Sequence, residues 1–171
     1  GFIYKPEYAG SASPEIVSDI EYHLSQIQSM DHVKYTPIAE AISQGICTIV
    51  DATSNYNDHL RTMVDIESIK SSGIRIISDP MYGAGAGYLS HLLSGSSSEL
   101  IEIHGYRNPI FPGMSQPEPI TDNLNELSVA VLEHNANIGL ALDADADRFG
   151  LMDNNGRFVT PLEVFALLAL Y

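Results

Sequence analysis

Apolar positions in the second half of the chain alternate between short continuous runs and helical repeats. The runs at 74–78, 100–104 and 138–142 are rich in β-branched or aliphatic residues, which is typical of buried strands. Helical spacing predicts helices over about 87–93 and 124–134, between these strands, and Thr121 or Asp122 can cap the second of them. The order strand–helix–strand–helix–strand predicts an open α/β sheet with crossover helices.

The first part of the chain predicts helices more clearly than strands. Ser13 is a suitable N-cap before Pro14, and the following apolar residues share one helical face: Ile16, Ile20, Leu24 and Ile27. Another helix is expected over 55–70, closed by a Ser-Ser-Gly sequence. The intervening segment 36–55 is less regular and contains a β-prone run at 47–50.

The C-terminal part of the chain carries two local signals. Asp153-Asn154-Asn155-Gly156 lies between two apolar runs and predicts a β-hairpin. Thr160-Pro161-Leu162-Glu163 has the pattern of a capping box with proline at the first helical position, so a helix should start there. The chain begins with Gly1 and ends within an apolar run, and we therefore expect it to be a piece of a longer protein.

The charge is strongly acidic, with 22 Asp and Glu against 8 Lys and Arg and a formal net charge of −14. Such a surface repels the phosphate backbone, so we expect no nucleic-acid partner. No apolar run is long enough to span a bilayer, and no signal peptide is evident, so no membrane partner is expected. The single cysteine, Cys47, cannot form an internal disulfide, which favours a cytoplasmic location.

Three aspartates at alternate positions follow the apolar run 138–142: Asp143, Asp145 and Asp147. Alanines separate them, so the backbone can curl and let the carboxylates converge. Their mutual repulsion is costly unless a cation lies among them. Hard oxygen ligands suit Mg²⁺, and three carboxylates leave coordination positions for water or a phosphate oxygen. The sequence therefore predicts a magnesium site just beyond a strand, where sites in open α/β sheets lie.

Spacing also bears on other interpretations of the acidic loop. An EF-hand needs glycine and glutamate where this sequence has Arg148 and Asn154, so that interpretation fails. A solvated acidic turn, partly neutralised by Arg148, remains an alternative. The glycine-rich segment 83–87 lacks the lysine of a P-loop, and a tight strand-to-helix turn is the better interpretation.

The segment 138–148, IGLALDADADR, resembles the metal-binding loop of the α-D-phosphohexomutases, the phosphoglucomutase and phosphomannomutase family. That family usually has glycine where this chain has Ala144. Further segments are similar to the family in the same order: 4–12, 79–85, 107–109, 111–113 and 117–119. The resemblance implies that 1–50 is the C-terminal remnant of the family's first domain with a linker. It also implies that 51–171 is the second, metal-binding domain, a three-layer α/β/α domain with a mixed, mainly parallel sheet; the N-terminal part is a short helical extension.

The resemblance also implies a mechanism. In these isomerases four domains surround a cleft, and a phosphoserine of the first domain exchanges its phosphoryl group with a hexose phosphate through a bisphosphate intermediate. Carried over by position, Asp143, Asp145 and Asp147 would bind Mg²⁺, and Arg148 would be a catalytic residue beside the phosphoryl group. A purely structural ion pair is the alternative for Arg148. The implied partners are the hexose phosphate and the remaining domains of the same chain.

Motifs that the sequence does not contain also bear on the expected activity. It contains no Ser-His-Asn-Pro type motif, so the nucleophile is expected before Gly1, and this stretch alone should be inactive. The sugar-reading loop is expected after Tyr171, so glucose, mannose and amino sugars are not distinguished. Two rival functions stay open: a magnesium phosphohydrolase, which would need a lysine although none follows Lys70, and a non-catalytic binding module.

Overall fold

The structure is a computed structural model that describes residues 3–27 and 33–171. The chain divides into two compact units, Gly1–Asp51 and Ala52–Tyr171. The first unit contains α1 (Pro14–Ser25) and α2 (Ile38–Ser43). The Ser13 hydroxyl accepts a hydrogen bond from the Ile16 amide at 3.5 Å, so the predicted helix start is confirmed.

The run at 47–50 forms no strand, although its composition is β-prone. Its apolar residues are largely exposed, with Ile49 at 79% and Val50 at 77%. A strand is stable only when it pairs with a neighbour, and β-propensity by itself does not supply one. No helix in the parts of the chain that the structure describes is long and apolar enough to cross a membrane.

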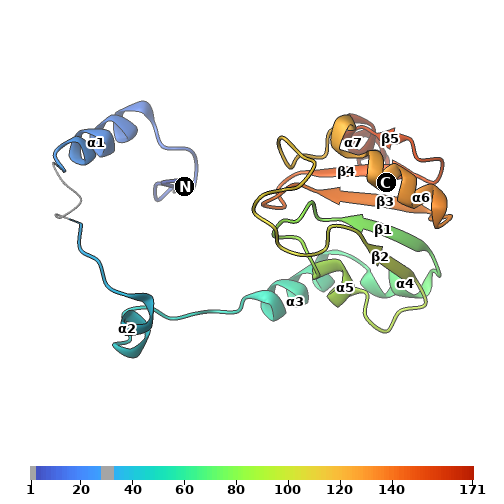
Figure 1. Cartoon of the computed structure of the whole chain (residues 1–171), viewed down its shortest axis with the longest axis horizontal. Helices are drawn as coiled ribbons and strands as arrows, with labels where there is room; N and C mark the ends of the chain where they lie inside the picture. Colours follow the sequence, from blue (N-terminus) through green and yellow to red (C-terminus); the bar gives the residue numbers. More distant parts are fainter. Residues whose placement is uncertain (1–2, 28–32) are drawn as a thin grey trace. The chain divides into compact units, whose positions relative to one another are not determined.

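The second unit is built on a five-stranded sheet in the order β2-β1-β3-β4-β5 (Figure 1). β1 pairs in parallel with both β2 and β3, whereas β3–β4 and β4–β5 are antiparallel. The strands are β1 (Arg75–Asp79), β2 (Glu99–Glu102), β3 (Ile138–Leu142), β4 (Phe149–Asp153) and β5 (Phe158–Val159). Because β1 and β3 run in the same direction, the segments that follow them emerge at the same edge of the sheet.

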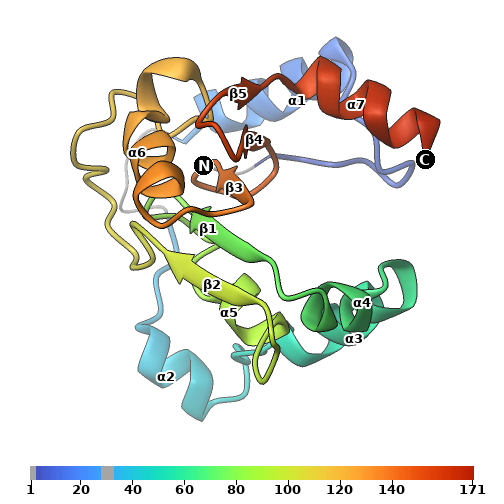
Figure 2. The ribbon, with the colours of Figure 1, turned by 90° about the vertical axis from the view of Figure 1, so that its right-hand side faces the viewer.

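Helices cover both faces of this sheet (Figure 2). On one face Ile77 of β1 packs in a cluster with Leu127 and Val131 of α6. On the other face Ile76 packs with Ile66 of α4 and with Leu93 after α5. Neighbouring residues of a strand point to opposite faces, so β1 contributes to both cores. The predicted α/β class, with a mixed sheet between helices, is confirmed.

The helices of this unit are α3 (Thr53–Met63), α4 (Ile66–Ser71), α5 (Tyr88–Leu92), α6 (Asn125–Glu133) and α7 (Pro161–Leu170), and a short 3₁₀ turn, η2 (Thr121–Asn123), precedes α6. The single helix predicted over 55–70 is two helices, because Asp65 starts a new one: its carboxylate accepts from the Ser68 amide at 3.0 Å. The cap predicted from Thr121 or Asp122 is also wrong. Leu124 occupies the N-cap position of α6, without a side-chain hydrogen bond.

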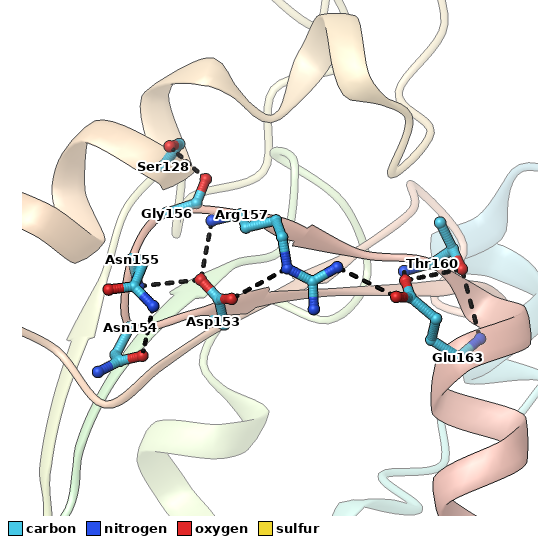
Figure 3. A network of polar contacts seen from close by, with 8 residues as sticks. All are labelled: Ser128, Asp153, Asn154, Asn155, Gly156, Arg157, Thr160 and Glu163. Atoms are coloured by element: carbon cyan, nitrogen blue, oxygen red, sulfur yellow. Dashed lines mark hydrogen bonds and ion pairs between the residues drawn. The ribbon is translucent and has the colours of Figure 1, made fainter.

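The predicted hairpin and capping box form one connected polar network (Figure 3). The Asp153 carboxylate accepts from the amides of Asn155 and Arg157, both at 2.9 Å, and closes the turn. The Arg157 guanidinium then spans from Asp153, at 3.2 Å, to Glu163 of α7, at 3.1 Å. The capping box between Thr160 and Glu163 is present as predicted. The network thus ties the hairpin to the start of α7.

Candidate metal centre

The segment 143–148 connects β3 to β4 as a tight turn rather than an extended strand. The Asp143 amide donates to the Arg148 carbonyl at 3.1 Å, and the Ala146 amide donates to the Asp143 carbonyl at 3.0 Å. Ala146 has φ 61°, a left-handed conformation that is uncommon for residues other than glycine. The curl turns the aspartates toward one another at the carboxyl end of β3.

The three aspartates do converge. Each of Asp143, Asp145 and Asp147 offers an oxygen, and these atoms lie within 4.8 Å of one another. Asp143 is buried, with 1% exposed, whereas the other two face solvent. The carboxylate of Asp143, and next the negative charge of Asp145, raise the pKa of Asp147. This crowding of negative charge is the electrostatic situation that a bound cation relieves.

Asp143 is the organising residue of the loop. Its Oδ1 accepts from the amides of Asp147 and Arg148, both at 2.9 Å, and its Oδ2 accepts from Arg148 Nε at 2.7 Å. Burial raises its pKa, but these hydrogen bonds outweigh burial and hold the pKa below the usual value. A carboxylate offers roughly four acceptor positions, so one remains for a cation.

Arg148 joins the loop to a distant part of the chain. Its Nη1 lies 2.9 Å from Glu118, and its Nε also lies 3.5 Å from Asp147. The contact with Asp143 raises the pKa of the guanidinium most, and the contact with Glu118 raises it further. The structural ion pair considered for Arg148 is therefore present. The side chain nevertheless stays 55% exposed, so part of the guanidinium remains open to an anion.

The glycine-rich segment after β1 packs directly against the acidic loop. The Ala84 amide donates to the Ala144 carbonyl at 2.8 Å. A Cβ on Gly83 would lie 2.6 Å from the Ala144 Cα, so only glycine allows the two backbones to approach this closely. The predicted tight turn is present, and it supports the loop that follows β3.

The structure adds a charged group that the sequence analysis did not identify. Asp79, the last residue of β1, is fully buried and contacts His104, which in turn contacts Glu126 of α6. A signal was available in the sequence, because an aspartate directly after an apolar strand needs a partner when it is buried. The identity of that partner, 25 residues further along the chain, was not available from local patterns.

A largely apolar cavity of about 500 Å³ also borders the acidic loop. Its lining includes Tyr56 and Leu60 of α3, Tyr88 of α5, and Asp145 of the acidic loop. The two tyrosine rings meet edge to face, with their centres 6.0 Å apart. The acidic loop is thus adjacent to an apolar hollow as well as to solvent.

The fold and the acidic loop together define an α/β/α domain that carries a carboxylate cluster at the carboxyl edge of its sheet. The family model for the phosphoglucomutase/phosphomannomutase alpha/beta/alpha domain II matches residues 54–156. The chain belongs to this phosphohexomutase family.

Named relatives agree with the family model. The chain is 37% identical to a "Probable phosphoglucosamine mutase" of Methanococcoides burtonii over 63% of this chain and 25% of that protein. It is 33% identical to the "Phosphoglucomutase/phosphomannomutase" of Thermococcus kodakarensis over 70% of this chain and 26% of that protein. The chain therefore spans about a quarter of the length of these curated relatives.

Solved structures show the same fold. A "putative phosphomannomutase" from Thermus thermophilus superposes with a TM-score of 0.65 at 31% identity, over 71% of this chain and 28% of that one. The phosphoglucomutase pp63/parafusin from Paramecium gives a TM-score of 0.68 over 94% of this chain and 33% of that one. At 18% identity the second similarity bears on the fold alone.

Proposed function

We propose that Asp143, Asp145 and Asp147 bind Mg²⁺, and that this chain is the metal-binding domain of a phosphoglucomutase or phosphomannomutase. The observation that carries the proposal is the convergence of the three carboxylates within 4.8 Å. This convergence occurs at the carboxyl edge of the sheet, in a chain of the phosphohexomutase family.

The donor set fits magnesium. All three groups offer hard oxygen atoms, and Mg²⁺ keeps several positions of its octahedral shell for water or phosphate. Asp143 is already oriented by the loop and held in the ionised form that binds a cation. When bound, the ion would neutralise negative charge on a phosphoryl group during its transfer.

Arg148 is proposed as the catalytic residue of this domain. Asp143 and Glu118 hold its guanidinium from two sides, which fixes the plane of the fork next to the carboxylate cluster. A planar guanidinium suits the oxygen atoms of a phosphate, and its exposed part can donate to them. Arg148 would therefore orient the phosphoryl group and stabilise its charge, while Glu118 keeps Arg148 in place.

The activity of the whole enzyme is part of the proposal. We infer transfer of a phosphoryl group within a hexose phosphate, through a phosphoserine and a bisphosphate. The relatives are named for glucose, mannose and glucosamine phosphates, so the substrate class is a hexose or hexosamine phosphate. The chain has no Ser-His-Asn-Pro type motif, so the serine would come from another domain and this chain alone would be inactive. Its single cysteine favours the cytoplasm.

A magnesium titration of the purified chain tests the metal site. Calorimetry should show one weak site in the wild type and a loss of at least about tenfold in affinity for Asp145→Asn, because a charged ligand is removed. Asp145 is exposed, so the substitution leaves the core intact.

Asp122→Asn is the matched control, since it removes an exposed carboxylate outside the loop. The control should bind like the wild type. Equal affinity in wild type and Asp145→Asn would reject the site and favour a non-catalytic acidic module.

A further inference from the structure

A chain of three ionisable side chains runs from the end of β1 to the surface. Asp79 is fully buried, and its Oδ1 lies 3.0 Å from Nδ1 of His104. Nε2 of the same ring lies 3.1 Å from Glu126, whose side chain is 78% exposed. The ring itself is only 11% exposed. His104 therefore bridges a buried carboxylate and a solvated one.

The protonation state of His104 decides how many hydrogen bonds its ring can donate to the two carboxylates. A doubly protonated ring donates to both carboxylates, whereas a neutral ring donates from one nitrogen only. Other titratable groups nearby are Tyr82, whose ring centre lies 4.5 Å from that of His104, Tyr106, which contacts Tyr82, and Glu102, which interacts electrostatically with Asp79. Asp79 and Glu126 are thus the acceptors that distinguish the two forms of the ring.

The bridge is connected to the turn that supports the acidic loop. Asp79 Oδ1 also accepts from the Met81 amide at 2.9 Å, and the Tyr82 amide donates to the His104 carbonyl at 3.1 Å. Met81 and Tyr82 have φ of 46° and 60°, a left-handed conformation that costs energy and persists only when surrounding contacts enforce it. Asp79 and His104 supply such contacts.

The same turn contacts the proposed metal site. Ala84 donates to the Ala144 carbonyl at 2.8 Å, and the lack of a side chain at Gly83 lets the two backbones touch. Ala144 lies between Asp143 and Asp145, so any shift of the turn moves the backbone that carries two of the three carboxylates. The contacts that link His104 to the acidic loop therefore involve backbone atoms that are packed closely against one another.

We propose that His104 is a positioning residue for the cation site, which acts through Asp79 and the turn 80–84 on Ala144. His104 contacts no aspartate of the loop, so its effect is on the geometry of the site. The inference rests on the proposed cation binding by the acidic loop. Groups that orient metal ligands from outside typically change metal affinity about 10–100-fold when they are removed.

Two substitutions of His104 separate hydrogen bonding from bulk. His104→Leu removes both donors, and we expect Mn²⁺ affinity of the whole chain, measured by electron paramagnetic resonance, to fall about tenfold. His104→Asn keeps a donor near the place of Nδ1, and asparagine tolerates the φ of 50° at this position. Its Mn²⁺ affinity should stay within about twofold of the wild type, because the bond to Asp79 is retained.

The matched control is His91→Leu, which changes an exposed histidine on α5. It should bind Mn²⁺ like the wild type. Equal Mn²⁺ affinity in His104→Leu and wild type would overturn the inference. Equal losses of affinity in His104→Leu and His104→Asn would overturn it as well. Neither result would contradict the proposed function. A wild-type chain that binds no Mn²⁺ would overturn both.

A second measurement keeps the inference testable if His104→Leu does not fold. In nuclear magnetic resonance spectra, the Ala84 amide shift should differ between the wild type and Glu126→Gln, a change at an exposed position that alters the partner of His104 Nε2. An Ala84 amide with the same shift in both proteins would overturn the inference.

Discussion

At the scale of single residues, the acidic loop shows which parts of a site are visible in a sequence. The spacing of Asp143, Asp145 and Asp147 was sufficient to expect their convergence, because nearby residues in a tight turn have few ways to arrange themselves. The pairing of Arg148 with Glu118 was not predictable, since the two lie 30 positions apart and meet only after the sheet has formed. The same reason hid the contact between Asp79 and His104.

The buried side chain of Asn57 tests how much an unpaired polar group lowers the stability of the fold. Its side chain is 1% exposed in α3, and neither amide atom has a hydrogen-bond partner among the residues that the structure describes. A buried polar group without a partner costs about 1–3 kcal/mol. Asn57→Leu, which keeps the branched shape of the side chain, should therefore raise the free energy of unfolding by about 1–3 kcal/mol in urea titrations.

Asn55→Leu is the control for this prediction, because Asn55 is exposed on the same helix and the change in helix propensity is identical. It should change stability by no more than about 0.5 kcal/mol. A destabilised Asn57→Leu variant would show that the amide is satisfied in the folded protein.

At the scale of elements, prediction succeeded where the signal was local and complete. β3 covers 138–142 as expected, since a short apolar run between asparagine and aspartate has clear boundaries. The start of α7 was predicted by a capping box that supplies its own hydrogen bonds. The β-prone run at 47–50 forms no strand, because a strand depends on pairing with a neighbour. The helix over 55–70 was divided because the cap at Asp65, in the middle of an apolar repeat, went unrecognised.

The hairpin between β4 and β5 carries a pH-dependent part of the stability. The hydrogen bond from the Arg157 amide is the largest influence on the pKa of Asp153 and lowers it. Burial raises this pKa, but the Asn155 amide and the Arg157 guanidinium lower it further, so the pKa stays below its usual value. A carboxyl group whose pKa is lower in the folded state stabilises the fold above its unfolded pKa of about 3.9. That stabilisation is lost as the pH falls through the lower folded pKa.

Thermal unfolding of wild type and Asp153→Asn at several pH values tests this. At neutral pH the wild type should have the higher Tm, because asparagine loses the charge that pairs with Arg157. The difference should shrink as the pH falls below about 4 and vanish once Asp153 is protonated. Asp122→Asn, at a surface position, should show no such convergence, and a Tm difference for Asp153→Asn that is constant with pH would contradict the assignment.

At the scale of the whole molecule, the charge bears on the proposed function. The net charge of −14 repels anions, and no lysine or arginine occurs between Asn108 and Asp147. A phosphate group can approach this region favourably only if a cation and Arg148 offset the repulsion. The family was visible in the sequence because its motifs occur in order over most of the chain. The supports of the acidic loop, which come from the turn after β1 and from Glu118, required the structure.

The most direct test of the metal site is anomalous diffraction from crystals of the chain soaked in Mn²⁺, which binds the same oxygen ligands as Mg²⁺. We predict one peak at the carboxyl end of β3, about 2–2.5 Å from oxygen atoms of Asp143, Asp145 and Asp147. An ion bound elsewhere, or a soaked crystal in which these three carboxylates hold no ion, would contradict it.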